Sequence, residues 1–422
     1  MELTVDSLLD EVRLAGLSEK YGTPLYVYDG AVIRRQLETL RSLFPAEAGV
    51  EVYYSMKCNP LLGIAQLLRR EGCRVEVASA GELAAVLEAG YPPADILFTS
   101  PGKTAEELEW AVDLGICSIN AESLEEIRRI DRIAAARGRV ADIAIRVNPN
   151  LEQKTAGIRM SGVSSQFGID EEELSGVLAE LPRLQSVRLI GFHVYFGTQI
   201  LSADALLAQL EDTFELALRY AEGSGTPLQF LDIGGGWGVP YFAHEAALEL
   251  DRLRAGIAEL WLRYAGRLRG TRIAVESGRF LLAEAGVFLT KVLYRKVSKG
   301  STYLVCDGGS NQHASSAFLG RYIRHNFPMR VLGRSGPSEP VTVTGPLCTA
   351  TDVLGQKVEL PAAAVGDVIC VDKSGAYGLT HSPVLFLSHA LPAEVLLHDG
   401  GEYVLRERGR VHDVIRGQLP LD

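Results

Sequence analysis

The sequence predicts an α/β protein with two parts, a (β/α)8 barrel and a C-terminal β-rich domain that is a barrel or a sandwich. Eight strand-like segments alternate with helical patterns between residues 50 and 275, and nearly every strand ends in a polar or glycine-rich cluster. After residue 284 the chain changes to short β-rich runs separated by glycine and proline. An open doubly wound sheet is the alternative for the first part. The polar strand ends favour the barrel, which builds its active sites at the carboxyl ends of its strands.

The elements are expected in the following order. An amphipathic helix covers 1–22, a strand follows at 23–29 and a helix at 30–43. The barrel strands are expected at 50–55, 74–78, 95–99, 116–120, 142–147, 188–194, 229–233 and 272–275. The helices between them are expected at 61–71, 81–89, 104–114, 122–137, 203–222 and 245–265. The β-rich runs of the second part are 287–297, 303–307, 341–344, 368–371 and 394–397.

The domain organisation follows from this order. Residues 1–28 are expected to contribute a strand to the β-rich domain, residues 29–284 to form the barrel, and residues 285–422 to form the C-terminal β-rich domain. A chain of 422 residues is too long for one ordinary core, which agrees with two domains.

The composition is that of an ordinary globular protein, with 47% hydrophobic and 23% charged residues. The net charge of -11 argues against nucleic acid and anionic membrane surfaces as partners. The first residues lack the basic and apolar regions of a signal peptide, and no stretch is long and apolar enough to span a bilayer, so we expect a cytoplasmic protein. The six cysteines form no CxxC pair, which fits a reducing compartment and predicts neither a disulfide framework nor a metal site.

The first barrel strand ends in a lysine, within the run Tyr53-Tyr54-Ser55-Met56-Lys57-Cys58-Asn59-Pro60. A lysine at the buried end of a strand is costly as a cation, and desolvation lowers its pKa toward that of a usable free amine. Such an amine can condense with an aldehyde to form a Schiff base. The alternative is a lysine whose ammonium simply reaches solvent from the strand end.

Three further strand ends carry residues that suit a cofactor. Gly234-Gly235-Gly236 follows the seventh strand, where backbone amides can converge on a phosphate, although a tight turn is the alternative. Glu276 and Arg279 close the eighth strand. The glutamate can hold a proton on a heteroaromatic nitrogen and the arginine can meet a carboxylate or phosphate, with a surface ion pair as the alternative. His193 is either a core histidine or a ring-stacking or acid/base residue.

Two loops of the β-rich domain carry reactive side chains. Cys348 and Asp352 lie in a loop that begins with Gly345-Pro346, which allows a reactive thiol, although a lone cysteine is most often a small buried hydrophobe. Tyr377 lies in the run Ser374-Gly375-Ala376-Tyr377-Gly378, which suits a phosphate contact or a simple turn. Together with the barrel residues, these features are the set that pyridoxal 5′-phosphate needs: covalent capture, an anchored phosphate and a protonated pyridine ring that accepts electrons.

The sequence resembles the fold-type III pyridoxal-phosphate-dependent decarboxylases, the group of diaminopimelate and ornithine decarboxylases, over nearly its whole length. The matching motifs, in chain order, are Tyr54-Ser55-Met56-Lys57-Cys58-Asn59, His193 with Gly197-Thr198-Gln199, Asp232-Ile233-Gly234-Gly235-Gly236, Glu276-Ser277-Gly278-Arg279, Gly345-Pro346-Leu347-Cys348 and Gly375-Ala376-Tyr377-Gly378. The resemblance implies an alanine racemase-like pairing of a TIM barrel with a β domain, a pyridoxal 5′-phosphate cofactor and a homodimer with shared active sites.

The resemblance also implies a role for each matching residue. Lys57 forms the Schiff base with the cofactor and His193 stacks on its ring. Cys348 is donated across a head-to-tail dimer and protonates the carbanion that carbon dioxide leaves behind. The residues implied to bind the cofactor's phosphate and ring nitrogen are Gly234, Gly235, Gly236, Glu276, Gly278, Arg279 and Tyr377. Those implied to bind the substrate are Arg279, Ser315, Leu319, Thr349 and Asp352.

Three positions depart from the diaminopimelate decarboxylases. Thr349 stands where they carry an acidic residue, and Ser315 and Leu319 stand where an arginine and a tyrosine grip the distal end of diaminopimelate. The sequence here instead resembles the branch in specialised biosynthesis, which includes decarboxylases of carrier-protein-bound glutamyl thioesters. We therefore expect a decarboxylase that acts on a small-molecule amino acid or on a conjugate such as a carrier-protein-bound aminoacyl group.

Three other activities compete with this prediction. Diaminopimelate decarboxylase of lysine biosynthesis is one alternative, and an amino-acid racemase on the same fold is another. Racemases need a second acid/base, commonly a tyrosine, and the Cys348 loop argues against that. A non-catalytic regulator is the third, and such homologues usually lose the lysine or the cysteine, whereas Lys57 and Cys348 are both present.

Overall fold

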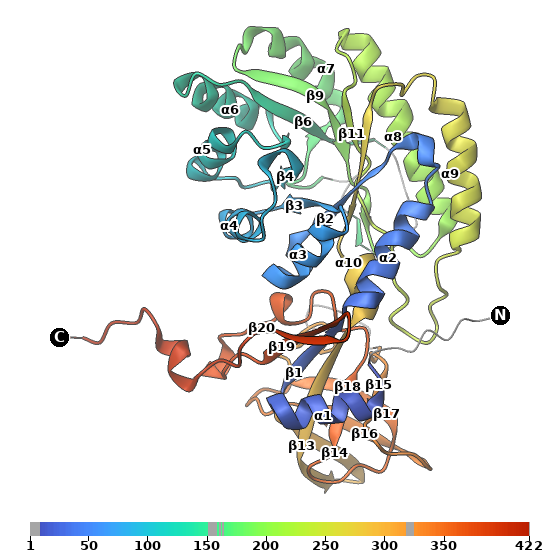
Figure 1. Ribbon diagram of the computed structural model, residues 1–422, viewed down its shortest axis with the longest axis vertical. Coiled ribbons are helices and arrows are strands. Elements are labelled where there is room, and N and C mark those ends of the chain that lie inside the picture. Colours follow the sequence, from blue (N-terminus) through green and yellow to red (C-terminus); the bar gives the residue numbers. More distant parts are fainter. Residues whose placement is uncertain (1–8, 151–157, 160–161, 163, 318–324, 422) are drawn as a thin grey trace. The chain divides into compact units, whose positions relative to one another are not determined.

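A computed structural model describes residues 9–150, 158–159, 162, 164–317 and 325–421 (Figure 1). The chain forms two compact units. We call residues 36–240 with 246–280 the barrel unit, and residues 1–35, 241–245 and 281–422 the β unit. The predicted domain boundaries after residues 28 and 284 stay a prediction. Throughout the described part of the chain, each helix is too short or too polar to cross a membrane.

The barrel unit contains eight parallel strands that follow one another around a closed ring, with β5 pairing β6 to complete it. The strands are β2 (Glu51–Ser55), β3 (Arg74–Val77), β4 (Ile96–Thr99), β5 (Ser118–Ala121), β6 (Ala141–Asn148), β9 (Val187–Val194), β11 (Phe230–Asp232) and β12 (Arg272–Ser277). Three further strands are short. Strand β8 (Ile169–Asp170) pairs with β6 of the ring, whereas β7 (Ile158–Arg159) and β10 (Gly197–Thr198) pair with each other. The predicted barrel is confirmed, and the open-sheet alternative is wrong.

Helices surround the ring of strands (Figure 1). They are α3 (Leu62–Arg70), α4 (Ala80–Glu88), α5 (Ala105–Leu114), α6 (Leu124–Ala136), α7 (Glu171–Glu180), α8 (Ala203–Ser224) and α9 (Leu250–Tyr264). Ser79, Thr104, Ser123 and Ser202 cap four of them, because each hydroxyl accepts a first-turn amide. Helix α7 is not among the expected helices. Its first turn is three glutamates and its buried apolar stripe is short, so the helical pattern there is weak.

The interior of the barrel is apolar near the amino ends of its strands. The residues that pack together there are Tyr53, Leu97, Cys117, Ala144, Ile190, Phe230 and Ala274. This core fills the ring, so the polar residues at the carboxyl ends of the same strands are left for a site.

The β unit is built around the N-terminal strand β1 (Leu25–Asp29), which lies between two strands from the far end of the chain. It pairs antiparallel with β13 (Gly286–Ser298) and parallel with β19 (Ala393–His398). The prediction that this strand joins the β-rich part is confirmed. The remaining strands are β14 (Ser301–Cys306), β15 (Met329–Val331), β16 (Ser338–Thr344), β17 (Val353–Pro361), β18 (Val368–Val371) and β20 (Gly401–Arg406).

Three helices complete the structure. Helix α1 (Glu11–Tyr21) starts at Asp10, whose side chain accepts an amide, and it packs Leu14 and Leu17 against the core of the β unit. Helix α2 (Gly30–Ser42) runs from the β unit into the barrel unit, and the short helix α10 (Arg279–Leu282) also spans the unit boundary.

Candidate active site

Lys57 lies in a tight turn that directly follows β2. The Tyr54 hydroxyl donates to the Asn59 carbonyl over 2.6 Å and fixes the turn. The Lys57 amine lies 3.3 Å from the carboxylate of Glu76, a residue near the end of the neighbouring strand β3. The Lys57 side chain is 43% exposed, whereas Glu76 is buried at 1%. The predicted burial of this lysine is therefore wrong, because the turn carries the amine away from the strand end and toward a carboxylate.

His193, Asp232 and Glu276 form a buried cluster at the carboxyl ends of β9, β11 and β12. The His193 Nε2 and Glu276 Oε1 atoms are 3.8 Å apart. Neither ring nitrogen of His193 nor the Oε1 atom of Glu276 has a hydrogen-bond partner among the described residues. Asp232, in contrast, accepts from the Gly234 amide over 2.9 Å and from the Asn120 side chain over 3.3 Å. Potential ligand atoms of the three residues lie within 4.8 Å of one another, so a metal ion could also use this spacing.

The surroundings of the cluster favour the uncharged forms of His193 and Glu276. Burial raises the pKa of Glu276 well above its usual range, and the charge of Asp232 adds to the effect. Burial also raises the pKa of Asp232 to about 7. Burial lowers the pKa of His193 far below its usual value, and the positive charge of Arg146 lowers it further. A neutral His193 ring beside a protonated Glu276 carboxyl can face an organic cofactor and exchange a proton with it.

The raised pKa of Asp232 predicts how the cofactor-free protein responds to pH. The folded-state pKa of about 7 lies above the unfolded value of about 3.9, so this group's contribution is fully present below pH 4 and is lost as the pH rises toward 7. Asp232→Asn should remove this dependence. We expect the wild-type free energy of unfolding to fall by roughly 2–4 kcal/mol relative to the variant over that range, measured by urea unfolding.

The exposed residue Asp251 provides the control for this measurement, because its carboxylate pairs with Arg254 at the surface and is 100% exposed. Asp251→Asn should leave the pH profile of the wild type unchanged. His193 acts in the opposite sense below pH 6.5, since its pKa is lowered, but it is present in both proteins and cancels in the comparison. Parallel profiles for the wild type and Asp232→Asn would contradict the prediction.

The run Gly234-Gly235-Gly236 is shaped by close approaches of neighbouring main chain. A Cβ atom on Gly234 would lie 2.4 Å from the Val194 carbonyl oxygen, and one on Gly235 would lie 2.5 Å from that of Glu276. Gly234 and Gly236 also have φ angles of +65° and +98°, which strongly favour glycine. Side chains are therefore excluded from this run, and its backbone is not covered by side chains of its own, as an anion-binding loop requires.

Gly278 and Arg279 lie just after β12, at the start of α10. A Cβ atom on Gly278 would come within 2.9 Å of the Cys58 sulfur, so this glycine lets the Lys57 turn pack against the end of β12. Lys57, His193, Glu276, Arg279 and the glycine run therefore all belong to the carboxyl-end rim of the barrel unit.

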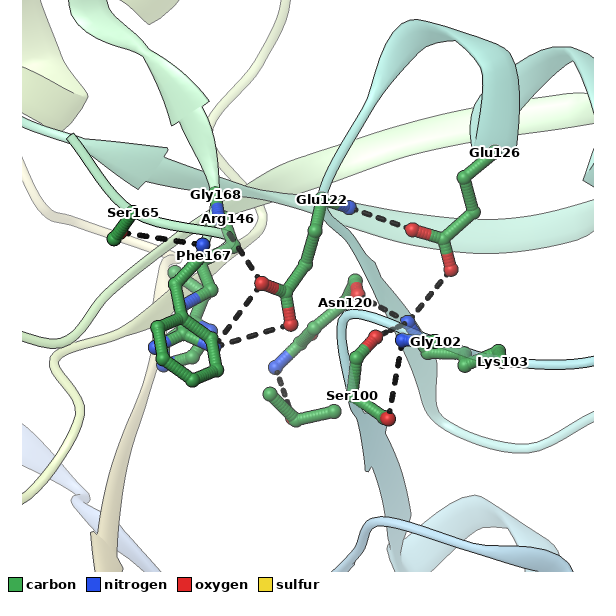
Figure 2. Close-up of polar contacts among 12 residues, drawn as sticks. Ser100, Gly102, Lys103, Asn120, Glu122, Glu126, Arg146, Ser165, Phe167 and Gly168 are labelled. Atoms are coloured by element: carbon green, nitrogen blue, oxygen red, sulfur yellow. Dashed lines mark hydrogen bonds and ion pairs between the residues drawn. The ribbon is translucent and has the colours of Figure 1, made fainter. Parts of the chain in front are cut away.

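Sequence reasoning gave no role to a polar network at the ends of β4, β5 and β6 (Figure 2). The Lys103 side chain is 0% exposed, and its amine donates to the carbonyls of Ser100 and Asn120 and to the carboxylate of Glu126. The Asn120 amide group in turn donates to Asp232. A fully hydrogen-bonded buried ammonium joins these strand ends to the carboxyl cluster.

A second ion pair lies beside that network (Figure 2). Arg146, at the end of β6, donates to the carboxylate of Glu122 over 3.1 Å, and both side chains are buried. Glu122 also accepts from the Gly168 amide, and the Arg146 guanidinium lies 4.7 Å from the centre of the Phe167 ring. The polar runs at these strand ends were the only signal in the sequence, and pairing partners cannot be identified from them.

In the β unit, Cys348 is exposed in the loop between β16 and β17. Asp352 from the same loop is only 3% exposed and accepts from the amides of Ser310 and Leu347. The Thr349 hydroxyl lies 3.0 Å from that of Thr351. The substrate roles of Thr349 and Asp352 stay predictions.

Tyr377 and Ser315 contact each other within the β unit. The Ser315 hydroxyl donates to the Tyr377 carbonyl over 2.7 Å. Tyr377 has a φ of +55°, so this hydrogen bond helps to hold its backbone in the left-handed region. Leu319 lies outside the described residues. Within the β unit, Ser315 thus contacts Tyr377, and Asp352 binds the backbone next to Cys348.

Comparison with known proteins identifies the class of the chain. Residues 30–283 match the family model of the pyridoxal-binding domain of pyridoxal-dependent decarboxylases, so the chain belongs to this family. It is 41% identical to the L-glutamyl-[BtrI acyl-carrier protein] decarboxylase of Niallia circulans over 421 residues, which covers 97% of each chain. It is 32% identical to the diaminopimelate decarboxylase of Pseudomonas aeruginosa, over 96% of this chain and 95% of that one.

The solved structures agree with this assignment. Diaminopimelate decarboxylase of Methanocaldococcus jannaschii, in complex with L-lysine, superposes with a TM-score of 0.89 at 27% identity, over 97% of this chain and 94% of that one. The protein is a pyridoxal-phosphate-dependent amino-acid decarboxylase. The barrel rim fits this cofactor, because it offers an accessible amine, a bare glycine run and buried His193 and Glu276 atoms that have no hydrogen-bond partner among the described residues.

Proposed function

We propose that the protein removes the α-carboxylate of a glutamyl group that a carrier protein holds through the side-chain carboxyl. The observation that supports this most is the similarity to a carrier-protein glutamyl decarboxylase at 41% identity over almost the whole of both chains. The diaminopimelate decarboxylases compared here are about 32% identical or less. The presence of Ser315 and Thr349, rather than charged residues that would grip a free distal group, agrees with a tethered substrate.

The cofactor would be held through four kinds of contact. Lys57 would carry it covalently, and His193 would stack on its ring as a neutral imidazole. Glu276 would share a proton with the ring nitrogen, which gives its buried carboxyl the partner that Oε1 lacks among the described residues. The phosphate would be bound by Gly234, Gly235, Gly236, Gly278, Arg279 and Tyr377. When bound, the cofactor supplies an electron sink for the charge that develops at the substrate's α-carbon.

The remaining steps belong to side chains of the protein. As the bond between the α-carbon and the carboxylate breaks and carbon dioxide leaves, the Cys348 thiol would give its proton to the α-carbon. Arg279 would orient the substrate at the end of β12. The hydroxyl group of Ser315 is already bonded to the Tyr377 carbonyl, so it would shape the pocket without adding charge.

The direct test is mass spectrometry of a γ-glutamyl carrier-protein thioester incubated with the holoenzyme. Loss of one carbon dioxide from the carrier-bound group, which leaves a 4-aminobutyryl thioester, is the expected result. A thioester that stays intact while a free amino acid is decarboxylated would contradict the proposal.

We propose that the active protein is a homodimer whose sites combine Lys57 of one chain with Cys348 of the other. Supporting this, the two residues belong to different compact units. If Lys57→Ala and Cys348→Ala chains are mixed in equal amounts, half of the dimers are hybrids and each regains one intact site. We expect about a quarter of the wild-type activity, measured after co-refolding or co-expression.

The matched control is a mixture of Lys57→Ala with Lys57→Arg, which should stay inactive because neither chain supplies the lysine. Inactive hybrids, verified by two different affinity tags, would show that one chain supplies both residues. We also place the reaction in the cytoplasm. None of the six cysteines, which all lie in the described part of the chain, forms a disulfide, and this fits a reducing compartment.

A further inference from the structure

The loop that carries Cys348 is fastened by one buried carboxylate. Asp352, four residues further on, is 3% exposed. Its Oδ2 atom accepts from the Leu347 amide, next to Cys348, over 2.7 Å. Its Oδ1 atom accepts from the Ser310 amide over 2.7 Å. Two short hydrogen bonds to one carboxylate therefore tie the thiol loop to a segment almost forty positions away in the sequence, and charge-assisted bonds of this kind are the strong ones.

Two glycines leave the space that this carboxylate occupies. A Cβ atom on Gly309 would lie 2.4 Å from Asp352 Oδ1, and one on Gly345 would lie 2.5 Å from Oδ2 and 2.2 Å from the Gly309 Cα. The two loops thus meet main chain to main chain around the carboxylate. No larger residue fits at either position without moving one of them.

The segment that contains Ser310 is itself bonded to the core of the β unit. The Tyr26 hydroxyl, from the central strand β1, donates to the Gln312 carbonyl over 2.6 Å. The ring of His313 lies 2.8 Å from the Ser374 hydroxyl and is completely buried. Asp352 therefore fixes the exposed thiol of Cys348 relative to the core of the β unit, and not only to its own loop.

We propose that Asp352 is a positioning residue that holds Cys348 where its thiol can protonate the α-carbon, in place of the substrate contact that the family resemblance implies. The inference rests on the proposed function for the reaction. The two hydrogen bonds that Asp352 accepts from Ser310 and Leu347, which we call the clamp, lie within this chain alone. Both carboxylate oxygens are occupied by main-chain amides inside the β unit. The side chain is only 3% exposed, so a substrate group could reach these oxygens only if the surrounding main chain moved.

Asp352→Asn tests the clamp, because an amide group can accept from only one of the two N–H donors and presents its own N–H₂ to the other. In the holoenzyme we expect kcat to fall about tenfold or more, with KM and the cofactor's visible absorbance unchanged. With the γ-glutamyl carrier-protein thioester in D₂O, deuterium should enter the product carbon with reduced stereospecificity, since solvent replaces a misplaced thiol. Amide hydrogen exchange at 308–313 and 345–351 should become at least about tenfold faster.

Asp367→Asn is the matched control. This aspartate also belongs to the β unit and also accepts a backbone amide, from Ala364 over 2.8 Å, but it pairs with Arg334 rather than with the thiol loop. It should leave stereospecificity and loop exchange as in the wild type. A rise in KM at unchanged kcat for Asp352→Asn would reveal a substrate ligand and overturn the proposal, as would full retention of stereospecific deuteration.

Two measurements keep the test open if Asp352→Asn does not fold. In the wild-type holoenzyme, the Ser310 and Leu347 amides should exchange more slowly than their loop neighbours, and fast exchange at both would refute the clamp. Gly309→Ala keeps the carboxylate but puts a methyl group into its space, and it should reproduce the loss of stereospecificity. If the wild type released no carbon dioxide from any substrate, the proposed function would fail, whereas the exchange measurements would still decide the clamp.

Discussion

Lys57→Ala is expected to abolish covalent attachment of pyridoxal phosphate and to lower decarboxylase activity by at least about a thousandfold, because the nucleophilic amine has no substitute at that position. Borohydride reduction of the wild-type holoenzyme, followed by peptide mapping, should place the cofactor on the peptide that contains Lys57. The same treatment of the variant should leave every peptide unlabelled, and the purified variant should lose the visible absorbance of the bound cofactor.

Lys57→Arg is the control for charge. It keeps a cation opposite Glu76, 3.3 Å from the amine in the wild type, but a guanidinium stays protonated and cannot condense with an aldehyde. Equal losses in both variants would assign the effect to the amine and not to the ion pair. Label on Lys103, a second lysine at the end of a barrel strand, would contradict the assignment. Its buried amine already has three hydrogen-bond acceptors, which makes it a poor nucleophile.

A γ-glutamyl carrier-protein thioester is expected to exceed free meso-diaminopimelate in kcat/KM by at least about a hundredfold. A buried arginine–carboxylate contact contributes a few kcal/mol, and its replacement by a serine forfeits most of that for a substrate with a free distal carboxylate. The Ser315 hydroxyl donates to the Tyr377 carbonyl over 2.7 Å, so it is already engaged within the protein. The measurement is kcat/KM for the thioester, diaminopimelate, ornithine and lysine under identical conditions.

Ser315→Ala is the matched control for this selectivity. It removes the hydroxyl but adds no charge, so the preference for the thioester should persist even if Tyr377 is less well fixed and the overall rate falls. Efficient turnover of free diaminopimelate by the wild type would refute the substrate proposal and would favour the second group of relatives, the diaminopimelate decarboxylases.

The barrel could be predicted because its cause is local. Strand segments with a polar end recur through the chain, successive strands pair with one another, and the last strand β12 pairs with the first strand β2. Contacts between side chains of different strands are not local, and they could not be predicted from the sequence. The carboxylate that contacts Lys57 comes from Glu76 in the next strand, and the charge that adds to burial in raising the pKa of Glu276 comes from Asp232 in another.

The contacts of Asp352 show a second reason why the sequence does not reveal such contacts. Its partners are the main-chain amides of Ser310 and Leu347, which every residue except proline could offer, so the side chains at those positions give no sign of the contact. Only Gly309 and Gly345 hint at it, as positions where no Cβ atom fits. The run that begins with Gly345-Pro346 predicted this aspartate in a loop between strands, but three-dimensional placement was needed to see what its carboxylate binds.

The position of β1 has a consequence for the order in which the protein is made. This strand is synthesised before the barrel strands, yet its two neighbours, β13 and β19, are synthesised only after all of them. The barrel unit, whose contacts are mostly between consecutive strands, can fold while synthesis continues. Strand β1 lacks both of these partners throughout that time, so the nascent chain carries an open strand edge until β13 and β19 have been made.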